Sequence, residues 1–224
     1  MDSLCGIVEL FGQSDWSWLR QVVPSYLQGL GALGVAIIAW RALTTWKEKV
    51  RAEKTIEFID ELTDVTHEFG LLISPAISVV RFAQMSIDSH TSAQKGVEES
   101  ENSGISSFIE TQGEQVSKRL STRLSKATPI LSKLQALSTK GHVMGLRDYD
   151  SFERALLNLR WVHSHLEAFC MLIGISNLNW NNLAVKKHMQ KLRQLDADDL
   201  TRTIDESSER MMKFASNAYK NAIK

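Results

Sequence analysis

Residues 21–40, QVVPSYLQGLGALGVAIIAW, decide how the chain is organised, because they form an uncharged stretch between Arg20 and Arg41. About twenty helical residues, at a rise of ~1.5 Å each, cross a hydrocarbon core ~30 Å thick. Amphipathic indoles, which favour membrane interfaces, flank the stretch at Trp16, Trp18, Trp40 and Trp46. The sequence therefore predicts a transmembrane helix over residues 21–43, preceded by a short periplasmic segment, residues 1–20.

The basic residues around this stretch predict its orientation. Arg20 precedes it, whereas Arg41, Lys47, Lys49, Arg51 and Lys54 follow it. Because basic residues concentrate on the cytoplasmic side, we expect a single-pass protein with a periplasmic N-terminus and a cytoplasmic C-terminal domain. Two alternatives stay open. A cleaved signal peptide would begin with basic residues, whereas Asp2, Glu9 and Asp15 come first here. A buried core helix would also accommodate the glycines.

Small residues share one face of the predicted span. Ser25, Gly29, Ala32, Ala36 and Ala39 follow one another at spacings of four and three residues. Small side chains allow helix backbones to approach closely in lipid. We therefore expect this face to be a packing face in a homo-oligomer, although glycines also occur in membrane helices that do not associate.

The region after the span has helical periodicity. A coiled-coil-like stripe with spacings of four and three is formed by Phe58, Leu62, Val65, Phe69 and Leu72. Residues 44–88 are therefore predicted to be juxtamembrane amphipathic helices, with a stop and restart at Ser74–Pro75. Residues 70–87 are also apolar enough to suggest, as alternatives, a second span or a segment that re-enters the membrane.

Residues 89–106, SHTSAQKGVEESENSGIS, have the composition of a flexible linker. It separates the membrane part from residues 107–224, for which we predict a cytoplasmic antiparallel helical bundle and thus an all-α fold. Expected boundary signals are a restart at Thr128–Pro129, a stop at Gly141 and a cap from Asp148 or Asp150. The expected core positions are Phe108, Val116, Leu120, Leu124, Phe152, Leu156, Leu159, Leu166, Phe169, Ile173, Met189, Leu192, Leu200, Ile204, Met211, Phe214 and Tyr219.

Catalysis is not indicated by any motif. Nucleophile elbows, phosphate-binding loops, dinucleotide fingerprints, kinase signatures and HExxH patterns do not occur in the sequence. His163 and Glu167 share a helical face, but a metal site needs further ligands, and polar contacts within the bundle explain them more simply. With only Cys5 and Cys170, no disulfide framework is expected. We therefore expect no enzyme activity, cofactor or metal.

Charge is balanced overall, at 26 basic and 26 acidic residues, but it is unevenly distributed. Acidic residues predominate in residues 46–90 and basic residues in 111–148, so that the two segments can attract each other. Candidate phosphate or lipid contacts are Lys118, Arg119, Arg123, Lys126, Lys186, Lys187, Lys191 and Arg193. Solvated helix faces are the simpler interpretation, and nucleic acid is the less favoured partner.

Residues 45–70, TWKEKVRAEKTIEFIDELTDVTHEFG, follow a Trp-flanked span and precede a Pro-interrupted apolar segment. Over about residues 30–90 this arrangement resembles uncharacterised bacterial membrane-anchored helical proteins. Their design is similar to that of the membrane effectors of retron-type anti-phage defence systems. The resemblance implies a location in the bacterial inner membrane and a membrane-perturbing effector held silent by a protein partner. A non-toxic membrane scaffold or tether and a nucleic-acid-binding membrane tether remain the alternatives.

Overall fold

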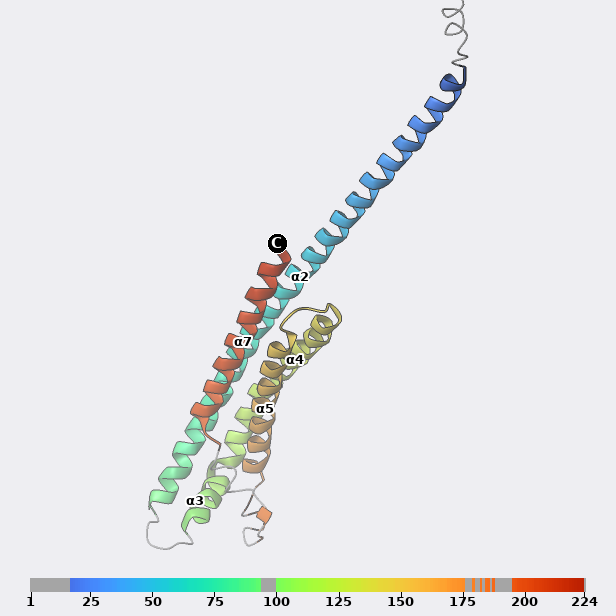
Figure 1. The fold of residues 1–224 in the computed structure, drawn as a ribbon. Helices are drawn as coiled ribbons and strands as arrows, with labels where there is room; N and C mark the ends of the chain where they lie inside the picture. Colours follow the sequence, from blue (N-terminus) through green and yellow to red (C-terminus); the bar gives the residue numbers. More distant parts are fainter. Residues whose placement is uncertain are drawn as a thin grey trace, which may run out of the picture. The chain divides into compact units, whose positions relative to one another are not determined.

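The computed structural model describes residues 17–93, 100–175 and 195–223, together with positions 179, 182, 184, 185 and 187. Its elements are α2 (Ser17–Ala93), α3 (Ser100–Phe108), the π-helical segment η1 (Ile109–Gly113), α4 (Glu114–Val143), α5 (Tyr149–Ile173) and α7 (Ala197–Ile223) (Figure 1). The described part of the chain contains no β-strand. The prediction of an all-α fold is therefore confirmed.

Helix α2 runs without a break through both of its prolines, Pro24 and Pro75. The expected stop at Ser74–Pro75 is therefore wrong. A proline inside a helix removes one backbone hydrogen bond. Its neighbours compensate, because Ile73, Ala76 and Ile77 are buried in the core. Tertiary packing of this kind outweighs the local preference for a helix boundary.

The chain divides into two compact units, residues 1–52 and residues 53–224, and α2 contributes to both. In the second unit, a single core combines side chains of α2 with those of α3, η1, α4, α5 and α7. Figure 1 shows α4 and α5 side by side, and these two helices are in contact, as are α5 and α7. The part of α2 from Glu53 onward thus shares one core with residues from the predicted C-terminal bundle.

The predicted apolar stripes form this core. Phe58, Leu62, Val65 and Phe69 of α2 are buried, and Leu72 packs against them partly buried. All six positions expected for α5 are buried: Phe152, Leu156, Leu159, Leu166, Phe169 and Ile173. Val116 is partly buried, and Met189 and Leu192 lie outside the described residues. Tyr219 is 43% exposed, and Ala218 takes the buried position beside it.

The segment before α4 differs from a plain linker. Residues 89–93 close α2, and α3 begins at Ser100, so both ends of the predicted linker are helical. Gly113 ends η1, and α4 then continues through Pro129 without the expected restart. Thr128 donates a hydrogen bond from Oγ1 to the Leu124 carbonyl (2.9 Å), in keeping with an uninterrupted helix on both sides of the proline.

The turn between α4 and α5 lies beyond the predicted stop at Gly141. Helix α4 continues to Val143, and Gly145 takes the left-handed conformation (φ +62°) that ends it. Gly141 itself is buried, and a Cβ atom there would lie 2.9 Å from Cζ of Phe58. Its small size therefore serves packing rather than termination. Asp148 occupies the N-cap position of α5, but its side chain makes no capping hydrogen bond.

Candidate functional surfaces

The first surface is the apolar part of α2 within residues 1–52. Every described side chain from residue 30 to residue 49 is exposed. Large apolar groups are among them, at Leu30, Leu33, Val35, Ile37, Ile38, Trp40, Leu43 and Trp46, with exposed fractions between 46% and 70%. A helix that is apolar on all sides and uncovered is typical of a membrane span or of the interior of a larger assembly.

The predicted packing face lies on this surface. Ala32, Ala36 and Ala39 are exposed. Ser25 and Gly29 belong to helical residues of α2, but their side chains are outside the described part. A Cβ atom at Gly34 would meet no atom within 4 Å, so a larger side chain fits there in an isolated chain. The structure thus places the face on an uncovered helix.

Helix α2 is long and apolar enough to cross a membrane. Within Leu30–His90, 33% of the stretch that meets this test is buried, whereas every described side chain from residue 30 to residue 49 is exposed. That stretch therefore lies farther along α2, where Ile73, Ile77 and Val80 pack in the core. A core helix of a globular unit has this character as well.

The basic residues predicted to contact phosphate or lipid differ in their surroundings. Lys118 forms an ion pair with Glu114 (Nζ–Oε1 2.6 Å) on its own helix. This hydrogen bond, followed by the positive charge, lowers the pKa of the Glu114 carboxyl. Lys126 and Lys187 are exposed. Lys186, Lys191 and Arg193 lie outside the described residues.

Arg119 and Arg123 are different because they line a cavity between α2 and α4. It has a volume of about 620 Å³. Its lining consists of Ser74, Pro75, Ser78, Val79 and Phe82 from α2 with the two arginines from α4. We call it the α2–α4 groove. Ion pairs resolved among the described residues do not involve Arg119 or Arg123, and the lining contains no carboxylate.

Sequence reasoning missed the α2 side of this groove. Phe82 is 69% exposed, although it lies in an apolar stretch whose other face is buried at Ile77, Val80 and Ala83. Leu71 and Met85 are exposed in the same way. The signal was available, because large apolar residues that fall outside the buried register of a helix mark a second face.

The His163 side chain is buried within the core. Its Nε2 lies 3.2 Å from Thr128 Oγ1, and its Nδ1 lies 3.5 Å from Glu167 Oε2. The His165 ring instead packs against the Trp161 ring at a tilt of 35°, with ring centroids 3.9 Å apart. Among the described residues, no group of three or more histidine, cysteine, aspartate or glutamate side chains is arranged to hold a metal ion. Thr128 lies on α4, so its contact with His163 joins α4 to α5, whereas Glu167 lies on α5 itself, one turn after His163.

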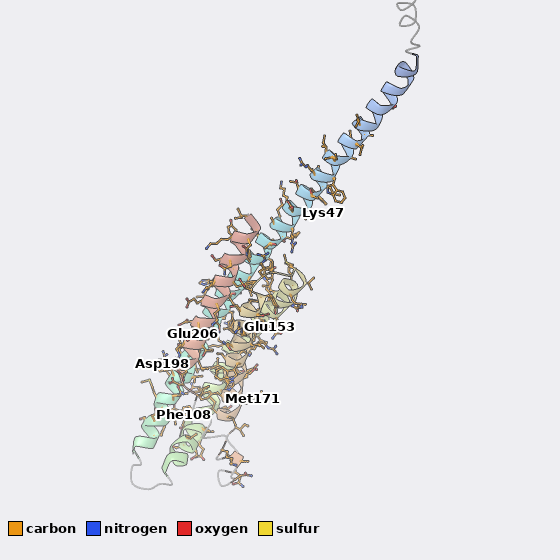
Figure 2. All side chains as sticks on the ribbon, in the orientation of Figure 1. Lys47, Phe108, Glu153, Met171, Asp198 and Glu206 are labelled. Carbon is orange, nitrogen blue, oxygen red and sulfur yellow. The ribbon has the colours of Figure 1, made fainter. Side chains whose placement is uncertain are left out.

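Opposite charges on α2 and α4 meet as their uneven distribution suggested. Glu61 of α2 contacts Lys133 (3.6 Å) and Lys140 (3.3 Å) of α4. All three side chains are at least one third exposed, so each pair contributes only ~0–1 kcal/mol. On α5, the side chains of Glu153 and Met171, which are labelled in Figure 2, are exposed.

No family model, curated protein sequence or solved structure matches the chain.

Proposed function

We propose that the protein is a membrane-anchored helical interaction protein of the bacterial inner membrane, acting as a membrane-perturbing effector that a protein partner holds silent. In this proposal residues 21–43 cross the bilayer once, the N-terminus is periplasmic, and residues 53–224 form a cytoplasmic antiparallel bundle. A homo-oligomer forms in the membrane through the small-residue face.

The uncovered apolar helix carries the proposal. Leaving a large apolar side chain in water costs ~1.5–3 kcal/mol compared with burying it. Leu30, Val35 and Ile38 point in different directions around α2, yet all are more than 60% exposed. A single neighbouring helix covers only one side of another helix. Lipid covers all sides, and this supports a membrane span at residues 21–43.

The compact unit supports an interaction role rather than catalysis. Among the described residues, its buried polar side chains are Thr55, Thr66, His163 and Ser207. The contacts resolved for Thr66, His163 and Ser207 are with other side chains and the backbone of the same unit. Groups with these roles stabilise helix packing. The anti-phage assignment itself rests on the resemblance of residues 30–90 in design, which is an analogy of architecture.

Induced expression of the full chain in bacteria tests the proposal. We expect loss of membrane potential when the chain is expressed alone. The double change Ile37→Arg and Ile38→Arg places two charges inside the proposed span, about five residues before its cytoplasmic end, and should abolish both insertion and depolarisation. Thr44→Arg with Thr45→Arg is the matched control, because charges at the cytoplasmic boundary are tolerated.

Two outcomes contradict the proposal. An intact membrane potential with the inserted wild-type chain would identify a scaffold or tether instead of an effector. Depolarisation by the Ile37→Arg, Ile38→Arg variant would show that the span is not its cause. Reporter fusions after Lys54 test the orientation separately, since activity of a periplasmic reporter at that position contradicts the proposed topology.

A further inference from the structure

The α2–α4 groove combines an apolar wall with a cationic wall. Pro75, Val79 and Phe82 supply the apolar surface, and Arg119 and Arg123 supply two guanidinium groups. A volume of about 620 Å³ lies within the range of small-molecule sites. We propose that the groove binds a nucleotide, with its phosphates on the two arginines and its base against Phe82.

The arginines are suited to a phosphate. Arg119 and Arg123 lie four residues apart on α4, so that their side chains are neighbours on one helix face, ~5–6 Å apart at Cβ. Guanidinium groups bind phosphate oxygens through paired hydrogen bonds. Lys118, next to them, forms an ion pair with Glu114. The ion pairs resolved among the described residues do not include Arg119 or Arg123, so both guanidinium groups can bind a ligand. The charge of the groove therefore selects an anion.

The apolar wall indicates the rest of the ligand. Phe82 is exposed and offers a ring on which a base can stack, as bases do on aromatic side chains in other binding sites. The wall extends over Pro75, Val79 and Phe82, which at ~1.5 Å per residue is about 10 Å. One leaflet of a bilayer needs ~15 Å for its acyl chains. The groove is thus too short for a phospholipid and long enough for a base and ribose.

Serine hydroxyls complete the site. Ser74 and Ser78 donate hydrogen bonds to the carbonyls of Gly70 (2.8 Å) and Ser74 (3.1 Å), and their oxygen atoms remain able to accept. A base or ribose carries N–H and O–H donors that match such acceptors. The groove thereby offers cations to the phosphates of a nucleotide and acceptors to its base or ribose. This proposal does not depend on the proposed membrane activity.

Binding to the detergent-solubilised full chain tests the inference. The probes are ATP, GTP, AMP and cyclic di-AMP, compared with adenosine and with inorganic phosphate, and the measurement is isothermal titration calorimetry. We expect at least one nucleotide to bind better than adenosine or phosphate. Arg119→Gln, Arg123→Gln and Phe82→Ala should each weaken this binding about ten-fold.

Matched controls keep the test specific. Lys126→Gln removes a cation from the same helix outside the groove, and Leu157→Ala removes an exposed apolar side chain from α5. Both should change the affinity less than about two-fold. All five side chains are exposed, and unchanged circular dichroism confirms that each variant is folded.

Three results overturn the inference. The first is that none of the four nucleotides binds. The second is that inorganic phosphate binds as tightly as any nucleotide and Phe82→Ala leaves the affinity unchanged. That result would describe a site for a simple anion only. The third is that the chain, with no affinity for nucleotides, binds phosphatidylglycerol vesicles through the same arginines. Membrane depolarisation is measured independently, so failure here is distinguishable from failure of the proposed function.

Discussion

Gly113 and Ile173 touch through their backbones: a Cβ atom built on Gly113 would overlap the main-chain carbonyl oxygen of Ile173. Gly113 ends η1 and Ile173 ends α5, so this contact joins the two elements without any intervening side chain. Both residues are buried. The second unit therefore depends on a glycine at this position.

Replacing Gly113 with alanine should destabilise the fold, because a backbone atom cannot move aside as a flexible side chain does. We expect a loss of ~1–3 kcal/mol, the usual effect of overpacking. Gly70→Ala is the control, since a Cβ atom at Gly70 meets nothing within 4 Å. Alanine there should be neutral or up to ~1 kcal/mol stabilising. Urea unfolding followed by circular dichroism compares the two, and equal midpoints would contradict the contact.

Dividing the chain tests the shared core. Phe58, Leu62, Phe69 and Ile73 of α2 are at most 1% exposed. A fragment of residues 53–224 keeps these side chains, and we expect it to be soluble, helical and cooperative in unfolding. A fragment of residues 107–224 loses them and leaves its own apolar stripes uncovered. It should aggregate or bind an apolar dye.

The outcome decides between two organisations of the chain. A stable, cooperative fragment of residues 107–224 would restore the interpretation of residues 89–106 as a linker between independent parts. Aggregation of residues 53–224 would instead show that the second unit needs residues before Glu53. Neither of these two results is expected if the compact unit begins at Glu53.

Much of the fold was predictable from spacing. Apolar residues at helical intervals correctly placed Phe58 to Phe69 and Phe152 to Ile173 in a core, because burial of one face is what such periodicity reflects. The helix boundaries predicted from proline and glycine were wrong at Pro75, Pro129 and Gly141. Their local preferences predict boundaries, but packing against other helices overrides them, and no local pattern encodes that a glycine is needed for contact with Phe58.

The groove was only half predictable. Arg119 and Arg123 were candidates by charge, but their neighbours Lys118 and Lys126 carry the same charge and do not line the cavity. Which basic residue faces an apolar groove depends on the rotation of α4 against α2, which is a tertiary relationship. Phe82 could have been found as a residue outside the buried register of α2.

Titration of Glu114 tests the pairing of Lys118. The hydrogen bond from Lys118, together with its charge, holds the pKa of Glu114 below its ordinary value of 4.5. A lowered carboxyl pKa gives stabilisation that is present above the unfolded pKa and lost as the pH falls through the folded one. Lys118→Gln should therefore raise the pKa of Glu114 toward 4.5, measured by NMR of carbon-13-labelled glutamate.

The same variant should hardly change the unfolding midpoint at neutral pH, because the two side chains are 76% and 75% exposed. Lys126→Gln serves as the control, since no resolved contact links it to Glu114, and it should leave the titration unchanged. A Glu114 titration that is identical in the wild type and in Lys118→Gln would show that the pair does not form in solution.

Association of the proposed span is testable with two identical substitutions. Gly29 lies with Ala32 and Ala36 on the small-residue face, whereas Gly34 lies five residues after Gly29, on the opposite side of α2, at 3.6 residues per turn. Close packing of small residues provides the attraction between helices in lipid. Gly29→Ile places a branched side chain where two backbones would approach, and it should reduce crosslinked oligomers in membranes several-fold. Gly34→Ile makes the same change toward lipid and should leave them abundant. Equal loss in both variants would indicate a general effect on the helix, and equal retention would exclude the small-residue face as the interface.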